Sequence, residues 1–440
     1  MHSMKPIVAI VGRPNVGKST LFNRMTRSRK ALVDDLPGVT RDRIYGDAKW
    51  DGVSFTVVDT GGFSDFESEQ FAPLVRYQVR QAIEEADAII MLFDGRQGVT
   101  PVDTDLVQRL RQSSKPVFYG VNKIDGPSHE SALSDFSVLG VAPLYPISAE
   151  HRYGVIDFMD ALTAVLPQTT VETSSDRIRL AVIGRPNVGK SSLINCLLGD
   201  DRLVVSEVPG TTRDAIDTIC TVNREEYLLI DTAGIRRKKR VQEKLEKFSV
   251  IKALKSLNRC HIALVMMDAV RGITEQDVRI AGYCFERGRA CIVLLNKWDL
   301  IEKDATTAKG YMEQVRGRLK FLNFAPVLTI SALTGQRTLK IFEWVRPVYE
   351  QYTSRVSTGR LNRVFEAIIH QHEPPAHRGR RVKLYYVTQT SSAPPTFVCF
   401  LNYPEAIHFS YRRYLMNQLR EALGLDWTPI RIIFRKREKK

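Results

Sequence analysis

The chain has 440 residues, of which 43% are hydrophobic and 26% charged, a balance typical of soluble globular proteins. This length suggests about three domains of roughly 150 residues each. The composition excludes a disordered chain and a collagen-like fibre, and no apolar run approaches the ~18 residues of a membrane-spanning helix. Six scattered cysteines form no Cys-x-x-Cys pair, which indicates a reducing compartment and argues against a zinc or disulfide scaffold. We therefore expect a cytoplasmic protein.

The net charge of +15 is concentrated near the C-terminus. Residues 353–440 hold 16 Lys and Arg against 6 Asp and Glu, so one fifth of the chain carries +10 of the imbalance. Such a segment favours a polyanionic partner, because each cation that neutralises a phosphate releases counterions. Nucleic acid is the favoured partner. A solubilising surface or an acidic lipid would also tolerate the charge.

An internal repeat organises the first 352 residues. Gly-Arg-Pro-Asn-Val-Gly-Lys-Ser occurs at 12–19 and again at 184–191, an offset of 172. The repeated motifs that share this order are Thr-Arg-Asp at 40–42 and 212–214, Asp-Thr-x-Gly at 59–62 and 231–234, Asn-Lys-x-Asp at 122–125 and 296–299, and Ser-Ala at 148–149 and 331–332. A duplicated domain explains the shared order.

Short apolar runs end at these motifs and predict strands. The expected strands are 7–11, 55–58, 88–93, 117–121 and 144–147, followed by 180–183, 227–230, 262–267, 291–295 and 327–330. Continuous apolar strands that alternate with helical stretches indicate a parallel sheet covered on both faces. In such sheets ligands bind beyond the carboxyl ends of the strands. We therefore expect two doubly wound α/β domains, at 1–166 and 178–352, joined by a flexible polar linker at 167–177.

The basic segment 353–440 is predicted to form a third, small α+β domain. Its expected elements are a helix at 361–370, strands at 383–389 and 396–401, a helix at 411–423 and a strand at 430–435. This order resembles a KH-type RNA-binding fold, but no Gly-x-x-Gly loop is present to clamp a nucleic-acid backbone. The apolar face of the second helix leaves Arg412, Arg413 and Arg420 mostly outside it. Phosphate contacts are expected from Arg378, Arg380, Arg381 and the tail 435–440.

The glycine-rich repeat is a phosphate-binding loop, whose backbone N–H groups surround a phosphate at a helix N-terminus. Lys18 and Lys190 are expected to reach the β- and γ-phosphates. The predicted loop residues are Gly12, Arg13, Pro14, Asn15, Val16, Gly17, Lys18, Ser19 and Thr20, and in the second copy Gly184, Arg185, Pro186, Asn187, Val188, Gly189, Lys190, Ser191 and Ser192.

A Mg²⁺ site is predicted beside each loop. The expected ligands are Ser19, Thr40 and Asp59 in the first copy and Ser191, Thr212 and Asp231 in the second. Asp59 and Asp231 are expected to end strands and to hold the metal through water, while the Gly62 and Gly234 amides meet the γ-phosphate. For either threonine, a simple turn role is the alternative. The nucleotide contacts of this motif are Asp59, Thr60, Gly61, Gly62, Asp231, Thr232, Ala233 and Gly234, and the predicted catalytic residues are Lys18, Thr40, Gly62, Lys190, Thr212 and Gly234.

The Asn-Lys-x-Asp motifs select the base. The Asp carboxylate accepts two hydrogens from guanine N1 and its exocyclic amine. Adenine offers no such pair, so a buried carboxylate would be left unpaired at a cost of about 1–3 kcal/mol. This favours GTP over ATP. The predicted base-site residues are Asn122, Lys123, Asp125, Ser148 and Ala149, and Asn296, Lys297, Asp299, Ser331 and Ala332.

The position after each Asp-x-x-Gly motif holds Phe63 or Ile235, where many small GTPases carry a glutamine that orients the attacking water. We therefore expect slow intrinsic hydrolysis. Asn15 and Asn187 are candidate ligands for a potassium ion, or they simply brace their loops. The second copy continues with five consecutive basic residues at 236–240. They form either a solvated face or a nucleotide-dependent contact with RNA or another domain.

Together, the tandem cassettes, the Gly-Thr-Thr-Arg-Asp of residues 210–214, the basic run and the C-terminal module resemble the bacterial Der/EngA family over essentially the full length. The resemblance implies an α/β fold with two P-loop GTPase domains in tandem followed by a KH-like domain. It also implies hydrolysis of GTP to GDP and phosphate, Mg²⁺ as cofactor and stimulation by K⁺. The implied role is assembly and stability of the large ribosomal subunit. We expect a monomer whose partners are that subunit and its ribosomal RNA, with no membrane contact.

Two other functional classes share part of this sequence pattern. A GTPase that assists an RNA-modifying enzyme would share these motifs, but the sequence shows no catalytic cysteine, metal cluster or second cofactor motif. A purely structural RNA-binding protein would not need two intact sets of Mg²⁺ and guanine determinants. Both classes fit less well than a nucleotide-controlled assembly factor.

Overall fold

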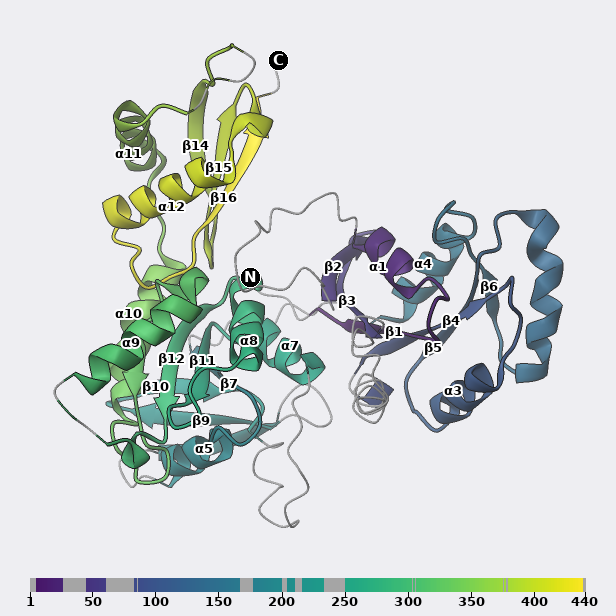
Figure 1. The fold of residues 1–440 in the computed structure, drawn as a ribbon, viewed down its shortest axis with the longest axis horizontal. Helices are drawn as coiled ribbons and strands as arrows, with labels where there is room; N and C mark the ends of the chain where they lie inside the picture. The colour runs from purple at the N-terminus through teal and green to yellow at the C-terminus, as the bar shows by residue number, and fades with distance from the viewer. Residues whose placement is uncertain are drawn as a thin grey trace. The chain divides into compact units, whose positions relative to one another are not determined.

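The computed structural model describes residues 5–26, 45–60, 83–84, 86–166, 177–199, 204–209, 216–232, 250–302, 304, 306–374, 376 and 379–437. These residues group into two compact units. The first unit holds a six-stranded sheet, and the second holds a seven-stranded and a three-stranded sheet (Figure 1). Among them, none of the helices is both long and apolar enough to cross a membrane.

The sheet of the first unit is almost entirely parallel. Its strands are β1 (Ile7–Val11), β3 (Val53–Asp59), β4 (Ala88–Asp94), β5 (Val117–Asn122) and β6 (Leu144–Pro146), in the order β3-β1-β4-β5-β6, with β2 (Tyr45–Trp50) antiparallel at the β3 edge. The helical elements are α1 (Lys18–Met25), α3 (Pro101–Arg111), η3 (Pro127–Leu139) and α4 (Val155–Val165). Every residue of β1 and β4 is buried, as expected of strands covered on both faces.

The second copy repeats this arrangement. Its parallel strands are β7 (Ile178–Ile183), β10 (Glu225–Leu229), β11 (Ile262–Asp268), β12 (Ala290–Asn296) and β13 (Val327–Thr329), in the order β10-β7-β11-β12-β13. The strands β8 (Val204–Pro209) and β9 (Ile216–Val222) extend the β10 edge in antiparallel pairing. The helical elements along this part of the chain are α5 (Lys190–Leu198), α7 (Val250–Arg259), α8 (Glu275–Glu286), η5 (Trp298–Leu300), α9 (Thr307–Arg318), η6 (Lys320–Leu322) and α10 (Lys340–Thr353).

The predicted parallel strands are confirmed within a few residues, whereas the antiparallel strands β2, β8 and β9, of which β2 and β8 lie at sheet edges, were not predicted. Strand β2 has the sequence Tyr-Gly-Asp-Ala-Lys-Trp, and only its first and fourth residues are buried. An edge strand with one half-solvated face lacks the continuous apolar run that identifies a central parallel strand.

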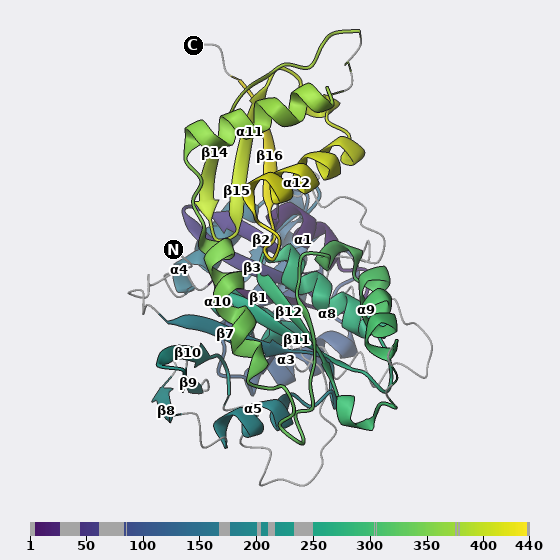
Figure 2. The ribbon, with the colours of Figure 1, turned by 90° about the vertical axis from the view of Figure 1, so that its left-hand side faces the viewer.

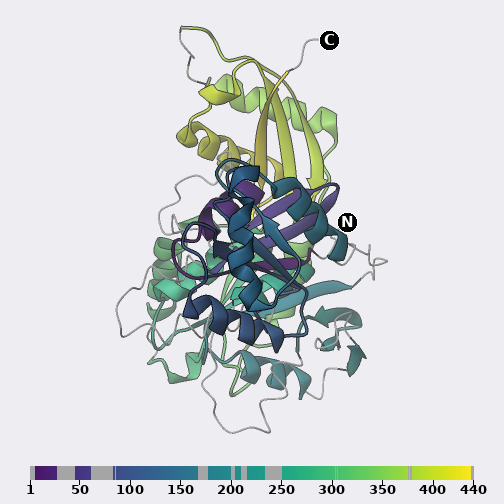
Figure 3. The same cartoon turned by 90° about the vertical axis from the view of Figure 1, so that its right-hand side faces the viewer.

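The third sheet lies in the second unit. Strand β15 (Pro395–Leu401) pairs antiparallel with β14 (Leu384–Ser392) and parallel with β16 (Arg431–Lys436). The helices α11 (Thr358–Gln371) and α12 (Phe409–Leu423) lie on one face of this sheet (Figures 1, 2 and 3). The short helix η7 (Pro404–Ala406) follows β15. Val387, Phe397 and Cys399 meet Phe365 and Leu415 in the core of this layer pair. The predicted α+β domain is thereby confirmed.

Two arginines of α12 do not lie where the sequence placed them. Arg412 is 7% exposed, and its guanidinium lies 5.3 Å from the centre of the Phe434 ring. Arg420 donates to the carbonyl oxygens of Leu425 and Thr428 at 2.6 and 2.7 Å, and burial lowers its pKa to about 10. The backbone that follows α12 folds back over these side chains. Only Arg413 of the three is exposed.

The three-stranded domain packs tightly on the seven-stranded domain within the second unit. The indole rings of Trp344 on α10 and Trp427 meet edge to face with centroids 5.2 Å apart. The backbone N–H of Trp427 donates to the Gln351 side chain at 2.7 Å. Arg431 of β16 donates to the Glu286 carbonyl oxygen at 2.7 Å. Trp427 also packs against the core of the seven-stranded domain.

Candidate nucleotide sites

The strand order brings the sequence motifs of each copy to the carboxyl ends of the parallel strands of its sheet. In the first copy, Ile10 of β1 lies opposite Asp59 of β3, and Asp94 of β4 lies opposite Asn122 of β5. In the second copy, Asp268 of β11 lies opposite Asn296 of β12. Because parallel strands end at the same edge, the phosphate loop and the base motif of each domain lie close together.

Each phosphate loop forms the turn into a helix. Gly17 and Gly189 cap α1 and α5 with φ of +94° and +102°, a left-handed conformation that glycine adopts without steric cost. The Lys18 ammonium donates to the carbonyl oxygens of Gly12 and Arg13 at 2.9 and 2.7 Å. Lys190 makes the same two contacts at 3.0 and 2.7 Å.

Burial lowers the pKa of Lys18, although the nearby Asp59 carboxylate acts in the opposite direction. Water therefore solvates the charge of the Lys18 ammonium poorly. Phosphate oxygens at this position would compensate for this poor solvation, because an anion favours the charged form of the lysine.

An ion pair braces each phosphate loop, and the sequence analysis missed it. Arg13 Nε lies 3.3 Å from a carboxylate oxygen of Asp103, and Arg185 Nε lies 3.2 Å from Asp277. Both aspartates are buried and belong to the Thr-x-x-Asp capping boxes that begin α3 and α8. The recurrence of Thr-x-x-Asp at 100–103 and 274–277 was the available sequence signal.

The metal side of the first site is partly assembled. The Ser19 hydroxyl donates to Asp59 Oδ2 at 2.7 Å. A hydroxyl and a carboxylate at this distance are hard oxygen donors of the kind that Mg²⁺ prefers, with the remaining positions usually taken by water and phosphate. Among the described residues, no group of three or more His, Cys, Asp or Glu could hold a metal ion. The donor set therefore fits a metal that is bound jointly with a triphosphate.

The second site differs at the equivalent aspartate. Asp231 was expected to end a strand, but β10 ends at Leu229 and Asp231 lies in a turn with φ of +60°. Its backbone N–H donates to the Asp217 carboxylate at 3.0 Å, and Asp217 is also bonded to Arg259. The Asp217 carboxylate on β9 thus stabilises the turn at Asp231 in place of a continued strand. Asp59 by contrast is the last residue of β3.

The asparagine of each base motif joins three loops. Asn122 donates to the Val16 carbonyl at 2.7 Å and accepts from the Ala149 N–H at 2.8 Å. Asn296 makes the equivalent bonds to Val188 and Ala332 at 2.7 and 2.8 Å. The asparagine therefore acts as a structural tie between the phosphate loop and the base loops.

The lysine of each base motif is held by an aspartate that the sequence analysis did not single out. Lys123 lies 2.5 Å from Asp94, and Lys297 lies 2.7 Å from Asp268. Although burial opposes it, the bonds from Lys297 and two backbone N–H groups keep the pKa of Asp268 below its usual range. Each carboxylate ends the strand beside the motif and fixes the lysine chain along the base site.

The two base-selecting aspartates have different surroundings. Asp125 accepts from the Ser148 hydroxyl at 2.8 Å and from Arg96 at 2.7 Å, and these bonds hold its pKa below the usual range. In the second domain, Oδ1 of Asp299 is buried and has no hydrogen-bond partner in the described part of the chain. A buried carboxylate oxygen without a donor fits a ligand that supplies one, as guanine would.

Arg96 donates to Asp125, the predicted acceptor of guanine, whereas the matching position of the second copy is Val270, so we expect Arg96 to compete with guanine at the first site. We expect Arg96→Val to tighten GDP binding at the first site by up to about fivefold, since Arg96 is exposed and exposed pairs contribute ~0.2–1 kcal/mol. Titration with a fluorescent GDP in a chain whose second site is silenced measures this. Arg109→Val, which removes another exposed ion pair, is the control. Weaker binding would instead show that Arg96 contacts the nucleotide.

Several predicted residues lie outside the described ranges. They are Thr40, Gly61, Gly62 and Phe63, Thr212, Ala233, Gly234 and Ile235, the basic run 236–240, Arg378, the tail 438–440 and linker residues 167–176. Their predicted roles stay predictions.

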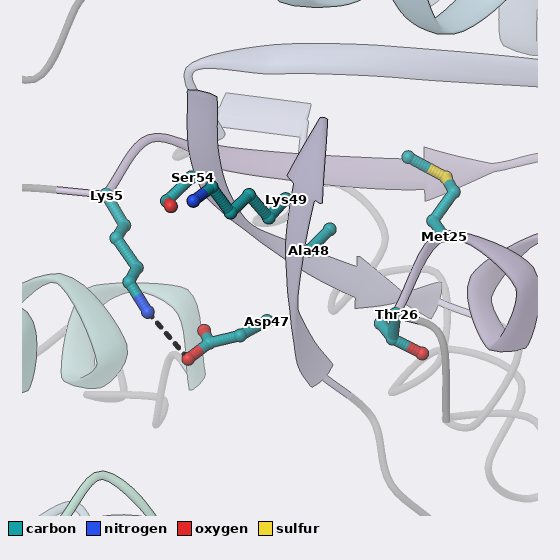
Figure 4. A pocket seen from close by; sticks show the side chains of 7 residues that line it. All are labelled: Lys5, Met25, Thr26, Asp47, Ala48, Lys49 and Ser54. Carbon is teal, nitrogen blue, oxygen red and sulfur yellow. Dashed lines mark hydrogen bonds and ion pairs between the residues drawn. The ribbon is translucent and has the colours of Figure 1, made fainter. Parts of the chain in front are cut away.

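A hollow of about 280 Å³ in the first unit is separate from the nucleotide motifs. It is lined by residues of β2, β3 and the C-terminal end of α1, and Lys5 and Asp47 form an ion pair of 2.7 Å there (Figure 4). None of its lining residues belongs to a predicted motif. The nucleotide sites are therefore defined by the loops described above.

Two known families match three parts of the chain. The family described as "50S ribosome-binding GTPase" matches residues 7–123 and 179–297. The family described as "KH-domain-like of EngA bacterial GTPase enzymes, C-terminal" matches residues 355–435. The predicted GTPase activity and the KH-like nature of the third domain are thereby confirmed.

Similar proteins match along nearly the whole chain. "GTPase Der" of Desulforapulum autotrophicum is 52% identical, with 98% of this chain and 90% of the relative covered. "GTPase Der" of Syntrophobacter fumaroxidans is 52% identical with 98% of each covered, and that of Geobacter sp. strain M21 is 53% identical with 99% and 100% covered. The chain belongs to the GTPase Der family of tandem-domain GTPases, which confirms the predicted family.

Proposed function

We propose that this GTPase uses its nucleotide state to control association with ribosomal RNA during assembly of the large ribosomal subunit. The observation that carries the proposal is the pairing of two complete sets of GTPase sequence motifs with a strongly basic KH-like domain in one chain. A structural RNA-binding protein would have no use for an oxygen at Asp299 that is buried without a hydrogen-bond partner among the described residues. We further propose that the chain acts as a cytoplasmic monomer, with domains at 1–166, 178–352 and 353–440.

In each domain, the proposed chemistry is attack of water on the γ-phosphorus of GTP, with cleavage of the bond to the β–γ bridging oxygen. Lys18 and Lys190 would stabilise the charge on the β- and γ-phosphates, and the Gly62 and Gly234 amides would meet the γ-phosphate. Ser19, Thr40 and Asp59, or Ser191, Thr212 and Asp231, would hold Mg²⁺. When bound, the metal neutralises charge between the β- and γ-oxygens.

Co-sedimentation with purified large ribosomal subunits tests the proposal. We expect binding with a non-hydrolysable GTP analogue and little binding with GDP. The logarithm of the affinity should fall linearly with the logarithm of salt concentration, because phosphate contacts release counterions. Salt-sensitive binding that is indifferent to nucleotide would reduce the basic surface to general RNA affinity.

Potassium stimulation is the second part of the proposal. Asn15 and Asn187 are exposed and adopt φ of +62° and +61° at the surface of their phosphate loops. We expect steady-state GTP hydrolysis to be several times faster in KCl than in NaCl at equal ionic strength, because a cation bound at the phosphate loop would stabilise negative charge that develops in the transition state. Equal rates in the two salts would remove the cation from the mechanism.

A further inference from the structure

A bulge in β14 turns two neighbouring tyrosines outward. Leu384 pairs with Leu401 and Tyr386 pairs with Phe400, so Tyr385 is an extra residue in the strand. In a regular strand, neighbouring side chains point to opposite faces, and one of the two rings would enter the core. Instead, Tyr385 is 39% exposed and Tyr386 is 42% exposed. Bulges are a recognised means of redirecting a side chain at a sheet edge.

The two rings belong to a larger aromatic and basic surface. Tyr386 stacks on Phe400 with centroids 4.4 Å apart and planes within 16°. The Tyr385 ring lies 4.8 Å from the Arg437 guanidinium and 5.9 Å from the Lys383 ammonium. We call this set, completed by the exposed Arg435 that pairs with Phe400, the aromatic face. The next residue of β14, Val387, is in the core beneath α11 and α12.

The chemistry of the aromatic face favours one kind of partner. The three strands of the sheet contain no Asp or Glu, so the cations around the rings are not neutralised from within the sheet. Aromatic rings stack on unpaired bases, and neighbouring cations contact the connecting phosphates. Bases in an A-form duplex are already stacked and paired, so they are inaccessible to these rings.

We propose that the aromatic face binds unpaired bases of single-stranded RNA, with Tyr385 and the Tyr386–Phe400 stack as platforms and Lys383, Arg435 and Arg437 as phosphate contacts. The inference rests on the proposed RNA association and specifies where and how the KH-like domain makes it. The face uses strands instead of the glycine loop that this domain lacks. We therefore expect this face to bind single-stranded RNA in preference to duplex RNA and to discriminate little between the four bases.

The test uses the full chain and a fluorescein-labelled 12-nucleotide single-stranded RNA, with a hairpin duplex as comparison, in fluorescence anisotropy. The variant Tyr385→Ala/Tyr386→Ala is expected to bind the single strand about tenfold or more weakly, with duplex binding and GTP hydrolysis unchanged. Tyr385→Phe/Tyr386→Phe should bind like the parent, because the rings remain. Phe409→Ala is the matched control, since Phe409 is equally exposed at 39% but lies on α12.

Unchanged single-strand affinity in the double alanine variant, with an unchanged melting temperature, would overturn the inference. An equal loss on single strand and duplex would overturn it as well, since stacking on unpaired bases would not be the cause. Failure of the parent chain to sediment with large subunits would instead count against the proposed function. The two failures are thus distinguishable.

Discussion

Replacement of Asp299 by asparagine is expected to lower the affinity of the second site for GTP by about a hundredfold or more. The carboxylate oxygen that is buried without a partner becomes part of an amide, whose N–H₂ group faces the donors of guanine. Each unpaired buried donor costs about 1–3 kcal/mol, and two such groups account for the expected loss. Xanthosine triphosphate carries a carbonyl where guanine has its amine, so it should bind the variant better than GTP does.

Binding stoichiometry from equilibrium dialysis measures this effect. GTP bound per chain should fall from two to one at concentrations that saturate the parent, because the first site keeps Asp125. Asp304→Asn is the control: Asp304 is an exposed carboxylate close in sequence that accepts hydrogen bonds from the nearby Thr306 and Thr307. Two bound GTP molecules in Asp299→Asn would show that this carboxylate does not select the base.

The substitution Gly189→Ala is expected to abolish nucleotide binding at the second site. An alanine Cβ would lie well under 3.0 Å from Nδ2 of Asn296, the side chain that ties the phosphate loop to the base loops. The φ of +102° at this position adds strain for any residue with a Cβ. The new methyl group would displace the Asn296 amide, so Asn296 would lose its hydrogen bonds to Val188 and Ala332 together.

A second glycine separates the clash from the backbone strain. Gly272 has φ of +69°, and a Cβ there would meet nothing within 4 Å. Gly272→Ala should therefore lower the free energy of unfolding by about 1 kcal/mol and leave nucleotide binding intact. Thermal melting and fluorescent-nucleotide titration of both variants make the comparison. Equal binding by the two variants would mean that the Asn296 tie does not support the site.

The central strands of each sheet were predictable because a strand that is buried on both faces consists of a continuous run of apolar residues. Strand β4 reads Ala-Ile-Ile-Met-Leu-Phe-Asp and is buried throughout, whereas β2 alternates between buried and exposed positions and gave no such signal. Arg412 and Arg420 were misplaced for a related reason: helical periodicity reports the face of α12 but not the chain that later folds over it.

At the sites, repeated motifs predicted which residues gather but not how they differ between copies. Asp125 is contacted by Arg96, a loop residue whose counterpart in the second domain is Val270. Neither Asn-Lys-x-Asp motif contains a residue that would predict this contact. The position of Asp231 depends on the carboxylate of Asp217, which lies on an antiparallel strand that was not predicted from the sequence. Differences of this kind arise from neighbours outside the motif, so a motif alone cannot disclose them.

The packing of the KH-like domain on the second GTPase domain has a thermodynamic consequence. The edge-to-face indole pair and the Arg431 bond connect hydrophobic cores that would otherwise melt independently. Elements joined in this way unfold as a cooperative unit. Any nucleotide that stabilises the second GTPase domain by mass action thereby raises the midpoint temperature of the KH-like domain as well. The occupancy of a GTP site is thus coupled to the heat resistance of a neighbouring domain.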